Sequence, residues 1–272
     1  LRLHVIQDYD LSEIFEYINP MMLYVRHLGF KGRFMEALEA GDSKAIELRN
    51  HVRRVENTML AHSEIAAKAV YKFFRIASDG NDVLVLNPNG NGILEKFRFG
   101  RQHQAEGLGL ADYVLPLGLD RPDYLGAFVT SIGPGIRELA NQWLEQGDYL
   151  ASHILQVLAL EGAEGFAEIL HQKIRGMWGF PDAVGIEKQD LFSPKYRGRR
   201  YSFGYPACPR LEDQEQLWRL LVPDKTIDVK LTEGFMMEPE GSVSALVFHH
   251  PQAKYFSLSA SDVEALETRL SG

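Results

Sequence analysis

Apolar residues recur at two different periods in separate stretches of this chain, and this change of period most constrains its fold. In 43–76 and again in 136–177 they recur every three or four residues, which predicts amphipathic helices. In 82–86 and 124–130 they form short, nearly continuous runs, which are typical of strands. Because helices and strands are expected in blocks and not in strict alternation, the pattern disfavours repeated strand–helix–strand units.

The strands are expected to form an antiparallel sheet. A hairpin is predicted where 82–86 and 93–99 flank a turn rich in Asn, Gly and Pro. The run at 124–130 is apolar almost throughout, which favours a central place in the sheet. Three more strands are expected near the C-terminus, at 226–237, 242–249 and 254–258. The predicted fold class is therefore α+β with an antiparallel sheet.

Polar residues mark where two of the helices begin. Asp42 or Ser43 is expected to be the N-cap of the helix over 43–76. Residues 261–264 have the pattern of a capping box, which predicts a terminal helix to about Leu270.

Two glycines lie inside the longest helical pattern. Gly162 and Gly165 each cost a helix ~1 kcal/mol relative to alanine. Glycine kept at such positions usually indicates that another backbone or a ligand comes close to the helix.

Composition excludes several classes of function. The net charge is −8, so the chain lacks the positive field that non-specific nucleic-acid binding needs. Its longest apolar stretch, around 21–25, is far shorter than the ~20 residues of a membrane span, and no signal peptide precedes it. Cys208 is the only cysteine, which excludes an internal disulfide framework and a cysteine-cluster zinc site. We therefore expect neither a nucleic-acid nor a membrane partner, and a reducing, cytoplasmic location.

Cofactor and metal motifs are incomplete. Gly107 and Gly109 lack the third glycine of a dinucleotide fingerprint. Glu168 and His171 have the spacing of a di-iron ligand pair, but the sequence has no second pair of that kind. His249 and His250 have no cluster of carboxylates nearby in the sequence. We expect no metal site.

A cationic, aromatic and proline-containing stretch at 195–209 remains as the candidate site. Its cations are Lys195, Arg197, Arg199 and Arg200, four in six positions of a chain that is acidic overall. An arginine fork can hold a carboxylate or phosphate through two parallel hydrogen bonds. The prolines hold the backbone extended, which would leave its carbonyls free as acceptors, and Tyr201, Phe203 and Tyr205 offer aromatic faces. Such a segment suits a small ligand with an anionic end and a flat ring, although a solvated connecting loop would have a similar composition.

The motif Arg-x-x-x-Gly-Tyr-Pro-Ala-Cys-Pro at 200–209 resembles the signature of the C-terminal S-adenosylmethionine-binding activation domain of cobalamin-dependent methionine synthase. Blocks at 163–171, 231–244 and 248–256 resemble other parts of that family in the same order. The resemblance covers nearly the whole chain from about residue 10.

The resemblance implies a C-shaped single domain with a central twisted antiparallel sheet flanked by helices. Residues 10–272 would form the activation domain, and residues 1–9 would be a linker from a preceding cobalamin-binding domain, since a chain that opens with Leu1 is expected to be a fragment. The implied activity is to bind S-adenosylmethionine and support the reductive methylation of inactive cob(II)alamin to methylcobalamin. This reactivates an enzyme that methylates homocysteine from 5-methyltetrahydrofolate.

The same resemblance implies cofactors and partners. Cobalamin would be held by another domain of the parent protein, and zinc would belong only to that protein's homocysteine domain. The partners would be the cobalamin-binding domain of the same polypeptide and flavodoxin or a related reductase. We expect a monomer that is part of a methyltransferase but is not active alone.

Charged ligand groups are assigned through the resemblance. Arg200 matches the family's arginine and should pair with the ligand's carboxylate, and Glu164 should attract its cationic part. Many members have an aspartate in the first segment that contacts the ligand's amino group. The nearest match here is Asn19, which keeps an acceptor but loses the charge, and Glu16 could substitute for it.

The adenosine end is assigned to the loop and to two aromatic residues. The backbone from Gly204 to Ala207 should run along the adenosine, with Tyr205 alongside. Tyr255 and Phe256 match the family's paired aromatics, and a cation near such a ring gains ~0.5–2 kcal/mol.

No catalytic acid or base is expected, because methyl transfer from a sulfonium requires placement and not proton transfer. Cys208 is expected to be structural. Two other functions stay open. One is a docking module for the cobalamin domain and a flavodoxin-type reductase with little ligand binding of its own, and the other is an independent methyltransferase.

Overall fold

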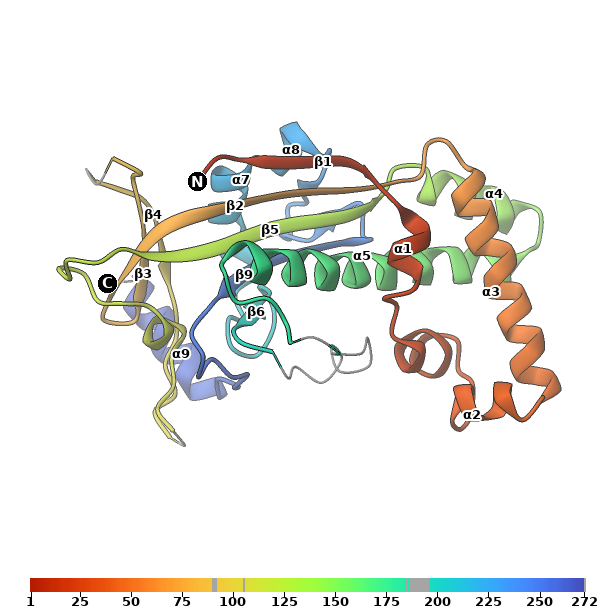
Figure 1. Ribbon diagram of the computed structural model, residues 1–272, viewed down its shortest axis with the longest axis horizontal. Coiled ribbons are helices and arrows are strands. Elements are labelled where there is room, and N and C mark those ends of the chain that lie inside the picture. Colours follow the sequence, from red (N-terminus) through yellow and green to blue (C-terminus); the bar gives the residue numbers. More distant parts are fainter. Residues whose placement is uncertain (90–91, 105, 184, 186–195, 272) are drawn as a thin grey trace.

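An antiparallel sheet forms the centre of the molecule (Figure 1). The computed structural model describes the chain except for residues 90–91, 105, 184, 186–195 and 272. Within the described part the sheet has seven strands. Six of them follow one another in space in the order β4 (Ile93–Arg98), β3 (Asp82–Leu86), β2 (Ala66–Asp79), β5 (Asp123–Gly133), β9 (Ser242–Phe248) and β6 (Arg199–Tyr201).

The seventh strand, β1 (His4–Tyr9), shares one edge of β2 with β3. Residues 67–71 of β2 pair with β1, and residues 76–79 pair with β3. Residues 4–9, which the sequence suggests as part of a linker, therefore belong to the sheet.

Helices pack around the sheet. They are α1 (Leu11–Phe15), α2 (Phe34–Glu39), α3 (Ser43–Ala61), α4 (Ile136–Glu145), α5 (Tyr149–Met177), α7 (Gln214–Leu221), α8 (Pro223–Thr226) and α9 (Ala260–Ser271), with the π-helix η1 (Met21–His27) and the short 3-10 helices η2 (Leu110–Tyr113) and η3 (Leu211–Asp213). Side-chain caps fix where three of them, α1, α3 and α5, begin. Asp42 is the N-cap of α3, since its carboxylate accepts a hydrogen bond from the amide of Ala45 at 2.9 Å.

Both faces of the sheet are buried. On one face, Phe128, Ile132 and Ala245 pack with residues of α1, α3 and α5. On the other face, Val129 and Leu246 pack with residues of β3, β4 and α7. Burial on both faces explains why the central strands are apolar almost throughout.

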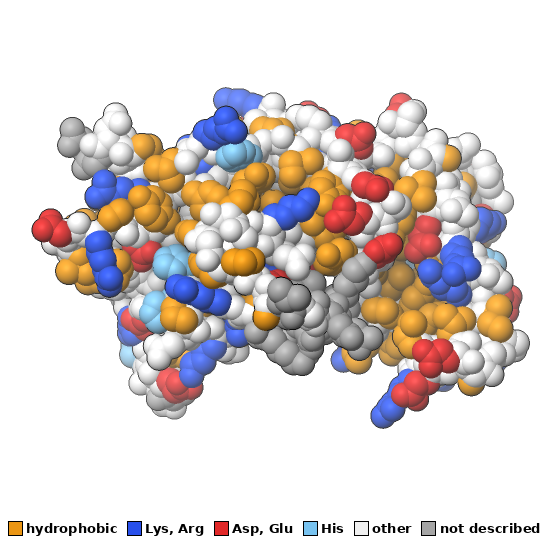
Figure 2. Space-filling view, viewed as in Figure 1, with side chains coloured by type: hydrophobic (Ala, Val, Ile, Leu, Met, Phe, Trp, Pro, Cys, Tyr) orange, Lys and Arg blue, Asp and Glu red, His pale blue; other side chains and the backbone are white. Residues whose placement is uncertain are grey.

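The molecule curves to one side. The sheet and α5 form its back, and the elements at the two ends, α9 and β3–β4 at one and α2–α3 at the other, turn the same way (Figure 1). The α+β, C-shaped architecture predicted from the sequence is thus confirmed. On the face shown in Figure 2, Lys and Arg side chains are scattered among acidic and apolar ones. None of the helices in the described part of the chain has the length and hydrophobicity of a membrane span.

The structure differs most from the sequence-based prediction in 43–76, where a single helix is expected. The helix ends at Ala61, and residues 66–79 form β2, the longest strand. This strand is rich in aromatic and β-branched residues, as strands usually are. Because many side chains on both of its faces are at least partly buried, the alternation that identifies a strand is lost, and the residual spacing resembles a helix.

Smaller boundaries also differ from the predictions. The pattern at 136–177 is two helices, because Asp148 caps α5 by accepting a hydrogen bond from the amide of Ala151. The strand expected at 226–237 is reduced to a short hairpin of β7 (Lys230–Leu231) and β8 (Met237–Glu238). Residues 254–258 form no strand. The hairpin at 82–99, the central strand at 124–130 and the strand at 242–249 are confirmed.

The capping box of the terminal helix lies two residues earlier than predicted. The amide of Ser259 donates to the carboxylate of Asp262 at 2.8 Å, and the amide of Asp262 donates to the hydroxyl of Ser259 at 3.3 Å. The helix itself is confirmed as α9.

The glycines of α5 permit the close approach that the sequence indicates. A Cβ atom at Gly165 would lie 3.2 Å from the carbonyl oxygen of Ile14 and 3.3 Å from the carbonyl carbon of Tyr17. These are backbone atoms of the N-terminal segment, which crosses α5 at this point.

Replacing Gly165 with alanine should therefore destabilise the fold, although alanine is the better helix former. We expect overpacking of ~1–3 kcal/mol to outweigh a propensity gain of ~1 kcal/mol. Gly176→Ala is the matched control in the same helix, since nothing lies within 4 Å of its Cβ position, and it should be neutral or stabilising. Urea unfolding of both variants measures the difference, and equal stabilisation by both would contradict the packing argument.

Candidate ligand-binding site

Two adjoining cavities open where α5, β6 and the segment after β9 meet. The loop cavity, of about 420 Å³, is lined by Glu164, Arg200, Tyr201, Ser202, Tyr205, Pro206, Ala207, Cys208, Tyr255, Phe256 and Ser257. The acidic cavity, of about 500 Å³, is lined by Tyr17, Asn19, Met22, His27, Leu160, Glu161, Glu164, Gly165, Glu168, Tyr196, Arg200, Tyr205 and Tyr255. The two cavities adjoin because they share four of these residues, Glu164, Arg200, Tyr205 and Tyr255.

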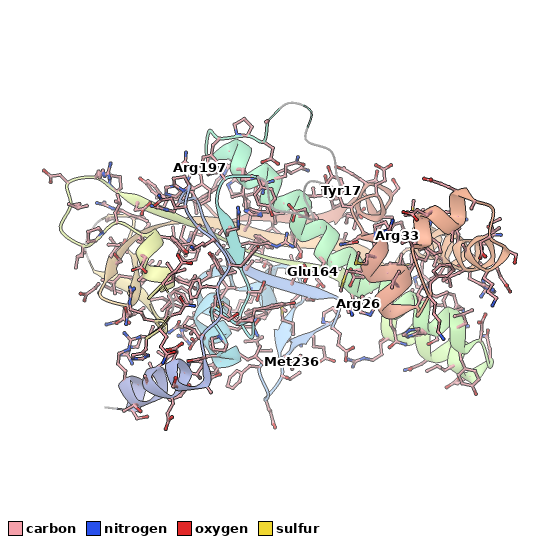
Figure 3. The ribbon with its side chains drawn as sticks, turned by 90° about the horizontal axis from the view of Figure 1, so that it is seen from below. Tyr17, Arg26, Arg33, Glu164, Arg197 and Met236 are labelled. Carbon is pink, nitrogen blue, oxygen red and sulfur yellow. The ribbon has the colours of Figure 1, made fainter. Side chains whose placement is uncertain are left out.

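Arg200 lies at the boundary of the two cavities, between two carboxylates of α5. Its side chain leaves β6, which pairs with β9 at the edge of the sheet. Nη1 donates to Oε2 of Glu168 at 2.9 Å, and Nη2 donates to Oε2 of Glu164 at 3.1 Å. The two acids are four residues apart, so they share one face of the helix. Figure 3 shows Glu164 near the middle of α5 in the view from below.

These two carboxylates differ in their exposure to solvent. The side chain of Glu164 is 39% exposed, whereas that of Glu168 is 9% exposed. Burial raises the pKa of Glu168, and the positive charges of Arg200 and Arg175 oppose this shift. Burial opposes the charged form of Arg200, but attraction to Glu168 and Glu164 outweighs it and raises the pKa of the guanidinium. The more exposed Glu164 is thus the partner that a ligand can replace most easily.

The loop after β6 is held in shape by its own backbone. Gly204 has φ +84°, which favours glycine, and its amide donates to the carbonyl of Cys208 at 2.9 Å. The carbonyl of Tyr205 accepts from the amide of Cys208 at 3.0 Å, and the carbonyl of Pro206 accepts from the amide of Leu258 at 2.9 Å. The expectation that the loop carbonyls would be free is therefore wrong for these three. Their bonds fix the loop as one wall of the cavity.

The aromatic residues of this region divide into exposed and buried ones. Tyr205 and Tyr255 are 59% and 53% exposed at the cavities. Tyr201 and Phe203 are buried in the core, so of the three aromatic faces expected in the loop only that of Tyr205 is exposed. Tyr201 supports the site from below, with its ring 5.5 Å from that of Tyr255.

Most of the residues predicted for the site lie together. Six line the loop cavity: Arg200, Glu164, Tyr205, Ala207, Tyr255 and Phe256. Gly204 makes the turn beside the cavity. Asn19 lines the acidic cavity, where its side chain accepts a hydrogen bond from the amide of Met21, the first residue of η1, at 3.0 Å. Glu16, considered as a substitute for Asn19, lies beside a different cavity between α1 and α3.

The sequence singles out four cations in 195–209. Of the three that the structure describes, only Arg200 lines a cavity. Arg197 donates to the carbonyl of His249 at 2.9 Å. Arg199 donates to the carbonyls of Tyr196 and Gly198. Lys195 lies outside the described residues. The cationic run is therefore mostly structural, and Arg200 is its member at the site.

Of the three acids in the wall of the acidic cavity, only Glu164 was predicted from the sequence as a site residue. Glu161, Glu164 and Glu168 are spaced by three and four residues on α5, a helical pattern that could have revealed a shared face. Glu168 was considered only with His171, as a metal motif. His171 is fully buried, its ring packs edge-on against Tyr196 at 5.1 Å, and burial lowers its pKa well below the usual value.

The site can bind a zwitterion that carries a flat ring. Arg200 supplies a cationic fork, the α5 acids supply negative charge, and the loop with Tyr255 and Phe256 supplies a partly apolar wall. Among the described residues no group of three or more His, Cys, Asp or Glu side chains is placed to hold a metal ion.

Comparisons with known proteins agree with this chemistry. A family model described as the activation domain of vitamin B12 dependent methionine synthase matches residues 10–268. The methionine synthase of Mycobacterium tuberculosis (strain ATCC 25618 / H37Rv) is 35% identical over 215 residues, which is 74% of this chain and 17% of that protein. The chain thus spans about a sixth of that relative's length.

A solved structure is also similar over the full length of the chain. The crystal structure of the MetH reactivation domain bound to AdoHcy, S-adenosylhomocysteine, superposes with a TM-score of 0.91 at 26% identity. The match covers 100% of this chain and 86% of the other. The family resemblance found in the sequence is confirmed.

Cys208 should be unreactive in the folded chain, although it lines the loop cavity. The thiol is 4% exposed, it donates to the carbonyl of Ser202 at 2.9 Å, and burial raises its pKa. Because the thiolate is the reactive form and its fraction falls tenfold per pKa unit, we expect modification by a disulfide reagent to be more than ~10-fold slower than in the unfolded chain. The absorbance of the thiol that the reagent releases, followed with and without guanidinium chloride, measures the two rates. Equal rates would show that Cys208 is accessible.

Proposed function

The chain belongs to the vitamin B12-dependent methionine synthase activation domain family, and on this premise we propose that it binds S-adenosylmethionine and supports reactivation of a cobalamin-dependent methionine synthase. In that reaction, one electron and the methyl group of S-adenosylmethionine convert inactive cob(II)alamin to methylcobalamin and leave S-adenosylhomocysteine. The chain, with β1 as part of its sheet, would form the binding module, and a different domain would hold the cobalamin.

The arrangement of Arg200 with the two α5 carboxylates carries the ligand assignment. The amino-acid end of S-adenosylmethionine has one carboxylate and one ammonium, and the adjacent sulfonium adds a second positive charge. A carboxylate on Arg200 would take over the fork from Glu164, the more exposed partner. Glu164 would then face the ligand's cationic groups. One arginine beside several acids thus matches a ligand with one negative and two positive charges.

The loop cavity supports the placement of the adenosine. Its walls are the hydrogen-bonded backbone from Tyr205 to Cys208 on one side and Tyr255 with Phe256 on the other. An adenine between backbone and aromatic groups is largely removed from water while its edges remain able to hydrogen bond. The structural relative bound to AdoHcy supports the same class of ligand.

The role of the chain in the chemistry is placement. No proton has to move in a methyl transfer from a sulfonium, so the residues contribute by fixing the ligand's orientation. We propose the cobalamin-binding domain of the same polypeptide and a flavodoxin-type reductase as partners, and a cytoplasmic location.

Ligand binding separates this proposal from a pure docking role. We expect Arg200→Ala to weaken S-adenosylhomocysteine binding by ~10- to 150-fold, which corresponds to the ~1.5–3 kcal/mol of a charge-assisted hydrogen bond. Isothermal calorimetry on the 272-residue chain measures this. Arg200→Lys keeps the charge but loses the fork, so it should also weaken binding. Because it leaves a cation beside the buried Glu168, this variant is a control for unfolding caused by the loss of that charge.

Arg197→Ala is the matched control, since this neighbouring arginine bonds to the backbone of His249 and lines neither cavity. Its affinity should equal that of the unmutated chain. Absence of binding heat in the unmutated chain would favour the docking role. Unchanged affinity in both Arg200 variants, with native circular dichroism, would show that the ligand binds elsewhere.

A further inference from the structure

The acidic cavity holds more negative charge than Arg200 alone balances. Glu161, Glu164 and Glu168 all line it from α5. The other charged or titratable side chains among its described lining residues are Arg200 from β6, His27 from η1, and the phenols of Tyr17, Tyr196, Tyr205 and Tyr255. With His27 neutral, the carboxylates outnumber the cations by two.

Glu161 is the least compensated of these acids. Its side chain is 8% exposed, and its Oε1 lies 2.8 Å from Nε2 of His27. Burial is the main cause that raises the pKa of Glu161, the negative charge of Glu164 adds to this, and the bond from His27 opposes it. A buried carboxylate beside a like charge is stabilised by any cation that enters the cavity.

Glu168, by contrast, is compensated by two arginines. Oε1 of Glu168 is buried and has no hydrogen-bond partner among the described residues, and Glu168 as a whole is 7% exposed. Its other oxygen, Oε2, accepts from Arg200. Nη2 of the buried Arg175 lies 4.0 Å from Oε1, so both oxygens of Glu168 face an arginine.

The N-terminal segment contributes no carboxylate to the cavity. Asn19 is neutral, and its side-chain oxygen already accepts a hydrogen bond from the amide of Met21. Glu16 lies beside another cavity. Since Arg200 would hold the ligand's carboxylate at the boundary of the two cavities, the ammonium on the neighbouring carbon must also lie close to this boundary.

We propose that Glu161, held in orientation by His27, is a further binding residue for the α-ammonium group of the ligand. The inference rests on the proposed function, because it requires an adenosyl amino acid whose carboxylate is held by Arg200. Glu161 and Glu164, one turn apart on α5, then both contact the ammonium from the same wall of the cavity. The carboxylates that bind the ammonium therefore come from α5 and not from the N-terminal segment.

The test compares two ligands that differ in the group in question. S-adenosylhomocysteine carries the amino-acid end, and 5′-methylthioadenosine has the same adenosine and thioether without it. Glu161→Gln is nearly isosteric and keeps a group for His27 to bond. We expect it to weaken S-adenosylhomocysteine binding by about tenfold or more, as expected for losing a charged partner, and to change methylthioadenosine affinity by less than about twofold. Calorimetry measures the first ligand, and displacement of it measures the second.

Two variants serve as controls. Glu56→Gln makes the same substitution at another partly buried, ion-paired glutamate, which lies on α3 outside both cavities, and it should change neither affinity. His27→Gln should weaken S-adenosylhomocysteine binding by less than Glu161→Gln does, because it removes only the group that orients the carboxylate.

Each other outcome overturns the inference in a distinguishable way. Unchanged S-adenosylhomocysteine affinity in Glu161→Gln would exclude the contact. Equal losses for both ligands would indicate a structural role. If the unmutated chain binds neither adenosyl amino acid, the proposed function itself fails.

Discussion

The packing of α5 across one face of the central sheet is the interaction on which the rest of the structure depends. Thr130 of β5 donates to the carbonyl of Ala163 at 3.1 Å inside this interface, and Gly165 lets the N-terminal segment cross the helix at backbone distance. The helix therefore contributes to the core on one side and to the acidic cavity on the other. A shift of α5 would move the carboxylates of the site together with the core.

Buried charge fixes the orientation of the site. Arg175, which is 1% exposed, donates two hydrogen bonds of 2.5 Å to the carboxylate of Asp182. Glu168, on the same helix as Arg175, accepts a hydrogen bond from Arg200. Breaking such a buried pair by removing one partner costs ~3–5 kcal/mol, so each member constrains its neighbour. The binding arginine is thus held by a permanent partner, Glu168, and an exchangeable one, Glu164. Pre-organisation of this kind reduces the entropy lost when a ligand binds.

The part of the site that is contiguous in the chain could be predicted from the residues themselves, and the family resemblance added the distant Glu164, Tyr255 and Phe256. Arg200, Tyr205 and Ala207 lie within eight positions, where residue type and the proline-fixed backbone already limit the geometry. Sequence reasoning missed Glu161 and His27, because these are brought together only when η1 folds back over α5. The sequence shows four clustered cations, but it does not show that backbone carbonyls occupy Arg197 and Arg199. The sequence does not show which backbone carbonyls compete with a ligand for an arginine side chain.

The sequence by itself determined the fold class, the hairpin at 82–99, the central strand at 124–130 and the family, because local period, turn residues and motif order are properties of neighbouring residues. Only the tertiary structure decided that 66–79 is a strand, since burial on both faces removes the alternation that would identify it. It alone also set which carboxylates face Arg200. Their distances and exposure depend on how a helix and a sheet edge meet, 36 residues apart in the chain for Glu164 and 32 for Glu168.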